Sequence, residues 1–185
     1  MIDSVRIGNG VTSIGNNVFY NCYSLASINI PSSVTSIGSS AFFNCYSLAS
    51  ITIPSSVTSI DTSAFQSCNS LASITIPRSV TRIGAKAFQS CYSLASITIP
   101  NSVTGLAAQA FHSCYGLKTF DFRRSTAVPT LSAVTAFQDT PSDKEIIVPD
   151  ELYDTWKAAT NWSETTNNIV NCIVKASESS LGPLS

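Results

Sequence analysis

Charged residues are scarce in this sequence. Only 11% of the 185 residues are Asp, Glu, Lys or Arg, against roughly 25% in typical globular domains. Asp61 is the one charged side chain between Arg6 and Arg78, and Ser and Thr supply the polarity instead. The net charge of −1 and the pI near 5.7 argue against nucleic acid as a partner, because phosphates require a basic surface.

Long apolar runs are also absent. The sequence contains no run of apolar residues long enough for a transmembrane helix, which needs about 18 or more. The first ten residues, MIDSVRIGNG, lack the apolar core of a secretory signal peptide. Residues 5–7 instead resemble the strand of a repeat whose beginning is missing, so we expect this sequence to be a fragment of a longer chain.

Catalytic motifs are missing as well. His112 is the only histidine, and it occupies a variable repeat position where we expect a solvent-facing side chain. We find no Gly-rich phosphate loop, no Ser nucleophile motif and no pair of carboxylates with a reason to meet. The sequence therefore predicts no catalytic residues, no cofactor, no metal and no enzymatic activity.

A 23-residue repeat dominates what is present. Residues 11–33 and 34–56 are identical at 18 of 23 positions, and the spacing continues along the chain. A fixed period of this length is typical of a solenoid, in which each unit buries its apolar side against its neighbours. Three columns of residues keep the period: Val11, Val34, Val57, Val80 and Val103; Phe19, Phe42, Phe65, Phe88 and Phe111; Cys22, Cys45, Cys68, Cys91 and Cys114.

Each repeat predicts one short strand, a turn, a second extended piece and a helical turn. Ile51 and Ile53 alternate with polar residues, as in a half-buried strand, and Pro54 closes the strand. Gly38 and Gly84 are expected to permit a bend. The spacing from Ala41 to Leu48 predicts a single turn of 3₁₀ or α-helix.

The cysteines predict a buried column. Five cysteines at the 23-residue spacing cannot converge on one zinc ion, and no partnering histidine or C-x-x-C pair exists. Stacked in register, they would lie about 5 Å apart, which by itself does not exclude a disulfide. We expect free, buried thiols that pack as small hydrophobic side chains.

The pattern Cys-x-x-Leu-x-x-Ile-x-Ile-Pro-x-x-Val-x-x-Ile-Gly-x-x-Ala-Phe resembles the Treponema-type leucine-rich repeat of the BspA-like family of microbial surface proteins. The resemblance covers about residues 5–149. It implies an α/β repeat fold: a right-handed, curved solenoid with parallel strands on its concave face. It further implies an extracellular or cell-surface role in adhesion or in binding host proteins. Leu106, Phe120, Phe122 and Arg123 depart from the pattern in the fifth coil.

Four segments follow from the register. We predict a half coil and five coils over residues 1–124, a degenerate sixth coil with an insertion over 125–149, a C-terminal cap over 150–174 and a flexible tail over 175–185. The cap is expected to contain a helix from Asp150 to Ala159, with Trp156 on its inner face, followed by Trp162. Residues 169–174 predict a strand that covers the last open edge of the array.

Two columns of residues are candidates for binding: a polar column on the strands, and a tyrosine column that either forms a binding stripe or is partly buried against the neighbouring coil. Polar residues alternate with the buried isoleucines and must face away from the core, as at Thr98 and Asp121. Tyrosines follow the cysteines in four coils, interrupted by Asn69, and tyrosine supplies rigid contact area. The basic residues of the fourth and fifth coils offer a modest patch that is more typical of a solvated face. These are Arg78, Arg82, Lys86, Lys118, Arg123 and Arg124.

Three functions remain open at this point. The first is a non-catalytic interaction module that binds a protein or glycan, with Tyr92, Tyr115, Thr98, Asp121 and Arg123 as the predicted site. The second is a structural spacer, which the near-identity of the coils favours. Ice binding is a third hypothesis, and the curvature expected of a leucine-rich repeat argues against it. We expect the chain to act as a monomer or as part of a longer protein.

Overall fold

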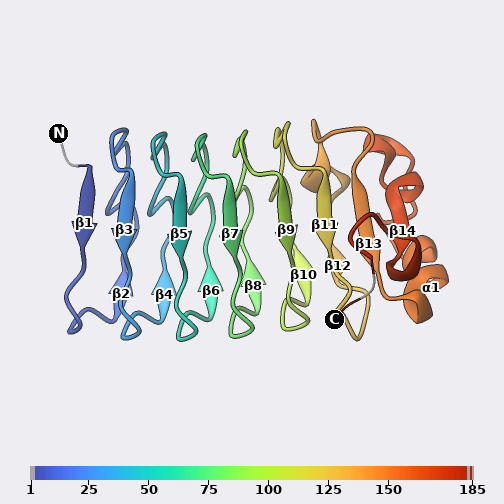
Figure 1. Cartoon of the computed structure of the whole chain (residues 1–185), viewed down its shortest axis with the longest axis horizontal. Coiled ribbons are helices and arrows are strands. Elements are labelled where there is room, and N and C mark those ends of the chain that lie inside the picture. The colour runs from blue at the N-terminus through green and yellow to red at the C-terminus, as the bar shows by residue number, and fades with distance from the viewer. Residues whose placement is uncertain (1–2, 183, 185) are drawn as a thin grey trace.

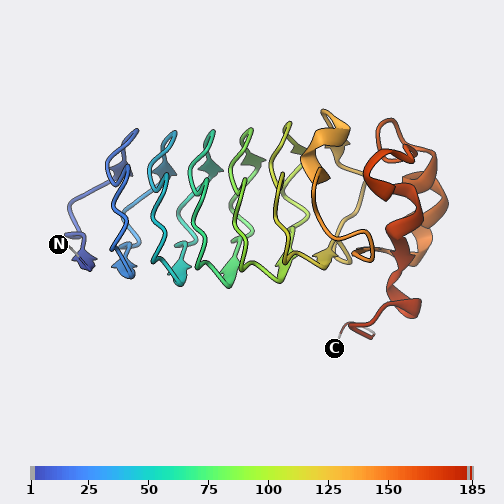
Figure 2. The same ribbon diagram turned by 90° about the horizontal axis from the view of Figure 1, so that it is seen from above.

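The fold is a single row of stacked coils closed by a cap of short helices (Figures 1 and 2). The computed structural model describes residues 3–182 and residue 184, and for Thr166 the backbone only. Neighbouring coils are paired in parallel and without a shift in register, so that Ile51 lies opposite Ile74. The predicted repeat of parallel strands is therefore confirmed.

One face of the row is formed by the longer strands, which we call the strand face. These strands lie side by side along the row in Figure 1, and hydrogen-bonded pairing groups them as β1 with β3, β5 with β7, and β9 with β11, β13 and β14. Their bounds are β1 Ser4–Arg6, β3 Ser27–Asn29, β5 Ser50–Thr52, β7 Ser73–Thr75, β9 Ser96–Thr98, β11 Thr119–Asp121, β13 Glu145–Val148 and β14 Ile173–Lys175.

A second sheet runs along the opposite side of the row, so the prediction of one strand per coil is wrong. The second extended piece of each of the six coils forms a two-residue strand, and these six strands pair in order as one parallel sheet. Each strand buries one apolar side chain, such as Ile37 or Ile60. The bounds are β2 Ser13–Ile14, β4 Ser36–Ile37, β6 Ser59–Ile60, β8 Arg82–Ile83, β10 Gly105–Leu106 and β12 Thr130–Leu131.

The third side of the first five coils is a chain of turns, not the predicted helical turn, whereas the sixth coil has a 3₁₀ helix on this side, Val134–Phe137. Alternate amides bond within the coil and across coils: Phe43 N donates to Ser40 O, whereas Phe42 N donates to Ala64 O of the next coil at 2.8 Å. This alternation requires left-handed residues, and Ser40 and Asn44 have φ values of 54° and 58°. Hydrogen bonding to the neighbouring coil thus takes the place of a continuous helix.

The repeat-position glycines have a different role from the one predicted. Gly84 does not have a positive φ, so it does not provide a left-handed bend. A Cβ atom there would lie 2.6 Å from Thr62 N and 2.7 Å from Asp61 C, both in the preceding coil. Glycine at this position permits the close approach of two backbones.

The row is nearly straight (Figure 2). Backbone hydrogen bonds link adjacent coils on all three sides, through the strand face, the second sheet and the turns. Parallel strands lie about 4.8 Å apart wherever they pair, so the spacing is nearly equal on every side and little curvature can develop. The strand face is consequently shallow and does not form the deep concave surface implied by the resemblance.

The core consists of the apolar columns. Phe42, Phe65, Phe88 and Phe111 are fully buried and stack with ring centroids 5.2 to 5.6 Å apart. The valine, leucine, isoleucine and alanine columns surround them. Each coil thereby buries its apolar residues against both neighbours, as a solenoid requires.

The sixth coil and the cap close the C-terminal end. The sixth coil contains the 3₁₀ helix η1 (Val134–Phe137) and strand β13. The predicted helix begins as η2 (Asp150–Leu152) and continues as α1 (Tyr153–Ala158). The short helices η3 (Thr166–Asn168) and η4 (Val170–Cys172) lead into β14, which pairs with β13. Trp156 and Trp162 are buried and stack edge to face at 5.3 Å.

The segment after β14 differs from the free tail that the composition predicts. It contains η5 (Ala176–Glu178), and Ser180 N donates to a carboxylate oxygen of Glu145 at 3.2 Å. Arg123 Nη1 donates to Gly182 O at 2.7 Å. Of the predicted tail, residues 183 and 185 lie outside the described residues.

Candidate interaction surface

The strand face exposes small hydroxyl side chains in register. In β3, β5, β7 and β9 the first and third residues are exposed and the middle isoleucine is buried. Ser50 lies opposite Ser73, and Thr52 lies opposite Thr75. Thr98, a predicted site residue, is exposed as expected. These four strands present hydrogen-bonding groups but no charge.

Asp121 and Arg123, also predicted as contact residues, are bound to each other instead. Asp121 is buried, and the two side chains are each 11% exposed. Arg123 Nε and Nη2 each donate to an Asp121 carboxylate oxygen at 2.9 Å, and Arg123 N donates to Oδ1 at 3.0 Å. The side-chain hydrogen bond to Asp121 raises the pKa of Arg123. In the sequence, an Asp and an Arg separated by one residue at the end of a strand could have indicated this ion pair.

The tyrosine ladder, defined as Tyr23, Tyr46, Tyr92 and Tyr115, is exposed and stacked. The exposed fractions are 49%, 40%, 44% and 61% in that order. Tyr23 stacks on Tyr46 with 5.1 Å between ring centroids, and Tyr92 stacks on Tyr115 at 5.3 Å. The structure thus brings together the two predicted tyrosines, Tyr92 and Tyr115. Stacking covers one face of each ring, and the edge and the hydroxyl of each ring stay exposed to solvent.

The structure contains a second aromatic stack that was not predicted from the sequence. Tyr20 and Phe43 lie with their ring centroids 4.8 Å apart, and Tyr20 is 45% exposed. Next to them, Asn44 Nδ2 donates to Asn21 Oδ1 at 2.9 Å. In the third and fourth coils, the repeat position of Tyr20 and Phe43 holds glutamine. The position therefore looks variable in the sequence, and the aromatic pair was not predicted.

His112 belongs to that same column and is not the solvent-facing residue predicted. Its side chain is 17% exposed, and its Nδ1 lies 3.0 Å from Gln89 Nε2 in the preceding coil. On the other side, Nε2 lies 3.5 Å from Asp139 Oδ2 in the sixth coil. In-register stacking thus places His112 against Gln89 of the preceding coil, within hydrogen-bond distance.

The cysteine column is buried from Cys45 onwards, as predicted, and its thiols are free. Each buried thiol donates to a phenylalanine carbonyl of the preceding coil, as Cys68 Sγ does to Phe42 O at 3.2 Å. Burial raises the pKa of Cys45 and of Cys114 to about 12. Cys22 is only half-buried, because it has no coil before it in the described chain.

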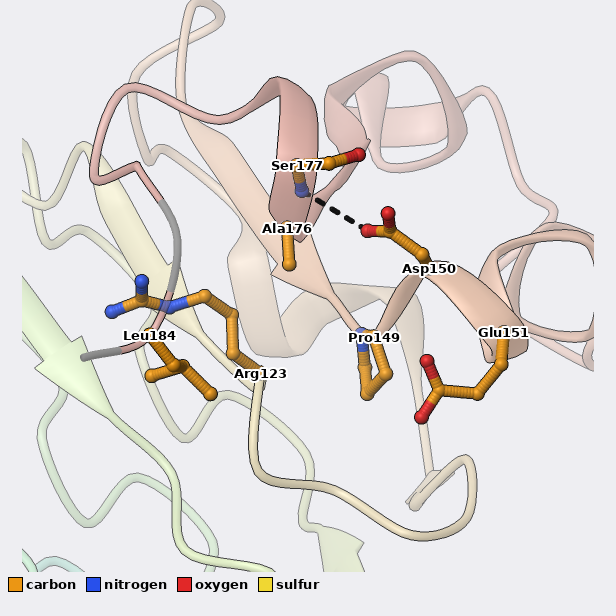
Figure 3. A pocket seen from close by; sticks show the side chains of 7 residues that line it. All are labelled: Arg123, Pro149, Asp150, Glu151, Ala176, Ser177 and Leu184. Atoms are coloured by element: carbon orange, nitrogen blue, oxygen red, sulfur yellow. Dashed lines mark hydrogen bonds between the residues drawn. The ribbon is translucent and has the colours of Figure 1, made fainter.

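The cap forms a pocket that sequence reasoning did not predict. It has a volume of about 390 Å³ and opens between the end of β13 and η5 (Figure 3). Asp150 lies at its wall, where Oδ1 accepts a hydrogen bond from Ser177 N at 3.0 Å. The hydrogen bonds from Ser177 lower the pKa of Asp150. Arg123 also lines this pocket, but its guanidinium is already paired with Asp121.

The basic residues do not form one patch. Arg78 follows the strand-closing proline, Arg82 lies on β8 of the second sheet and Lys86 lies in the turns, so they occupy different parts of the fourth coil. Lys118 pairs with Asp143 at 3.1 Å and lowers the pKa of that carboxyl. Within the described residues, no group of three His, Cys, Asp or Glu side chains could hold a metal ion, and no helix could span a membrane.

The repeat matches a known protein family over most of the array. Residues 1–118 match the BspA-type leucine-rich repeat region in six copies. This chain belongs to the BspA-type leucine-rich repeat family. No curated protein matches the sequence significantly.

Solved structures share the family's fold. A leucine-rich repeat protein of T. pallidum is 36% identical, with a TM-score of 0.62 over 64% of this chain and 57% of that one. A leucine-rich repeat protein of Bacteroides ovatus is 32% identical, with a TM-score of 0.64 over 80% and 42%. The pneumococcal vaccine antigen PcpA is 19% identical, with a TM-score of 0.70 over 85% and 39%, and shares the fold. This BspA-type chain spans about half the length of these relatives or less.

Proposed function

We propose that this BspA-type array is a non-catalytic interaction module at a cell surface. In this proposal the right-handed solenoid binds a protein or glycan through the strand face and the tyrosine ladder, either as a monomer or as part of a longer chain. The family resemblance supports the surface location. The contact residues are Thr98, Tyr92 and Tyr115, while Asp121 and Arg123 maintain the fold.

The exposed tyrosine ladder carries the proposal. Its four large rings stay 40% to 61% exposed, although the phenylalanine column of the same array is fully buried from Phe42 to Phe111. Aromatic side chains with a polar group are enriched in the energetic centres of interfaces. The adjacent hydroxyls of the strand face add many weak hydrogen bonds but no large side chains. We therefore expect affinity to depend mainly on the tyrosines.

The test is a comparison of two double variants. The parent chain, Tyr92→Ser/Tyr115→Ser and Tyr23→Ser/Tyr46→Ser are measured for adhesion to immobilised matrix proteins and to a glycan array. The proposal predicts that Tyr92→Ser/Tyr115→Ser loses at least about tenfold in affinity, or about 1.4 kcal/mol, and that Tyr23→Ser/Tyr46→Ser loses less. Unchanged adhesion of both variants would contradict it.

A structural spacer is the second candidate, favoured by a separate observation. Adjacent coils are joined by backbone hydrogen bonds on three sides, which makes the row resistant to bending. The exposed Ser and Thr columns are also nearly unchanged from coil to coil, whereas a binding site tuned to one partner diversifies. A parent chain that adheres to nothing in the panel supports the spacer role.

A further inference from the structure

The tyrosine ladder is interrupted in the third coil, where Asn69 occupies the repeat position of the tyrosines. Tyr23 stacks on Tyr46 on one side of the interruption and Tyr92 stacks on Tyr115 on the other, with ring planes only 18° and 21° apart. Tyr46 and Tyr92 therefore each have one face covered by a tyrosine. The second face of each ring is directed along the ladder towards the third coil.

Backbone hydrogen bonds fix the spacing at this interruption. In three successive coils, the residue after the ladder position donates to the ladder carbonyl of the preceding coil at 3.2 Å: Ser47 N to Tyr23 O, Ser70 N to Tyr46 O, and Ser93 N to Asn69 O. The rise per coil thus continues through the third coil. Tyr46 and Tyr92 are two coils apart, so their rings are separated by about 10 Å, twice the usual 5 Å of a stacked pair.

The Asn69 side chain does not extend to where a ring would lie. With its amide oriented to satisfy both carbonyls, Asn69 Nδ2 donates to Ser90 O at 2.9 Å and to Ser67 O at 3.2 Å. These bonds hold the side chain against the backbone turns. Asn69 is half-buried, whereas the flanking Tyr46 and Tyr92 are exposed.

We propose that Tyr46, Asn69 and Tyr92 form a binding site for one planar aromatic ring, supplied by a Tyr, Phe or Trp side chain of a partner polypeptide. A ring between the two tyrosines has about 5 Å to each neighbour, within the range that stacked aromatic pairs favour. It completes a ladder that the protein itself builds at that spacing on both sides. The exposed small residues Ser70 and Ala72 leave space for the partner's backbone.

This inference rests on the proposed interaction role and names the chemistry of one contact. It concerns three residues only, so an aromatic probe can fail to bind while the strand face still binds a partner. The adhesion assay and the probe experiment therefore fail independently.

The probe is the peptide acetyl-Gly-Tyr-Gly-amide, titrated into the ¹⁵N-labelled chain and followed by NMR. We expect saturation with a dissociation constant on the order of 1–10 mM, as suits a single side chain, and upfield shifts of the peptide ring protons from the flanking rings. Acetyl-Gly-Leu-Gly-amide is the control for a non-aromatic side chain, and free p-cresol separates ring binding from backbone binding. Equal shifts with the leucine peptide, or no upfield ring shift, would overturn the proposal.

Three variants locate the site. Asn69→Tyr should complete the ladder and weaken peptide binding by at least about tenfold, while Thr81→Tyr, which places a tyrosine at an exposed position beside the second sheet, should leave binding unchanged. Tyr92→Ser should also weaken binding. An Asn69→Tyr variant that keeps the parent's dispersed spectrum and still binds the peptide would disprove the assignment. Cellotetraose is also titrated. If it shifts the resonances of Asn69 and its neighbours and the tyrosine peptide does not, the site binds a glycan and not an aromatic side chain.

Discussion

Ile51 and Ile74 lie opposite each other in adjacent parallel strands, one coil apart, and both are buried. Each belongs to a core that several coils share. Changing Ile74 to Asp places an unpaired charge in that interior, which we expect to cost about 4 kcal/mol or more. Urea unfolding should show the loss, and Thr75→Asp, on the exposed position beside it, should change stability by less than about 1 kcal/mol. Equal losses of stability in the two variants would contradict the alternation of buried and exposed residues along the strand.

The thiol column predicts a loss of stability at alkaline pH. Burial raises the pKa of Cys45 and Cys114 to about 12 and also raises the pKa of Cys68 and Cys91. The folded state therefore holds these protons more tightly than the unfolded state, in which a thiol titrates near pH 8.5. The resulting stability is complete below about pH 8.5 and is lost as the pH rises towards 12.

The measurement is the urea midpoint between about pH 7 and 10.5. Each buried thiol contributes up to about 1.4 kcal/mol per pH unit above its unfolded pKa. Replacing Cys68 and Cys91 by Ala should make the decline shallower, and the native thiols should resist alkylation below about pH 8. A decline with the same slope in the double variant would show that other groups cause it.

The turns predict a stabilising substitution. Lys86 has a φ of 58°, a conformation that glycine and asparagine adopt with less strain than other residues. Lys86→Gly should raise the unfolding free energy by about 0.5–1 kcal/mol. Ala85→Gly, at a neighbouring position without positive φ, should lower it by a similar amount, and thermal unfolding compares the two. Destabilisation by both would mean that strain at Lys86 is unimportant.

The close approach of two backbones at Gly84 predicts that a methyl group added there destabilises the fold. Gly84→Ala brings a Cβ to 2.6 Å from Thr62 N, so the two coils must separate, at a cost of about 1–3 kcal/mol. Gly15→Ala is the matched control, because its Cβ meets only Val18 Cγ2 at 3.6 Å. Similar melting temperatures of the two variants would contradict the close-approach explanation.

The sequence was sufficient to predict the repeat fold because the columns are strict. The identical spacing of Phe42, Cys45 and Ile51 in successive coils indicates both the stacking and the buried side chains. The turn conformation could not be inferred in the same way. Its alternate amides bond to the next coil, and only the assembled row shows that Phe42 N has Ala64 O as its partner.

The residues predicted for the site differ in their exposure, for a related reason. Tyr92, Tyr115 and Thr98 are exposed because their positions follow from the repeat. Asp121 and Arg123 lie where the repeat pattern ends, and there the alternation of exposed and buried residues no longer decides orientation. The approach of Gly182 to Arg123 joins residues 59 positions apart, a contact that no local pattern indicates.

The ion pair between Asp121 and Arg123 predicts a structural role for both residues. Arg123→Ala leaves a buried carboxylate without its partner and releases Gly182, which we expect to destabilise the cap by about 2–4 kcal/mol. Adhesion of the folded variant should be unchanged. Limited proteolysis should then cleave near η5 first. Lost adhesion with unaltered stability would return Arg123 to the binding site.

The most direct test of the proposed interaction role compares the two sheets of the row. Thr75→Arg places a long charged side chain on the strand face, and Thr81→Arg places the same side chain at an exposed position beside the second sheet. Both variants are measured for adhesion to the partner found in the protein and glycan panel. We predict that Thr75→Arg loses at least about tenfold in affinity and that Thr81→Arg binds like the parent. Equal binding by both variants, or a loss confined to Thr81→Arg, would contradict the proposed role of the strand face.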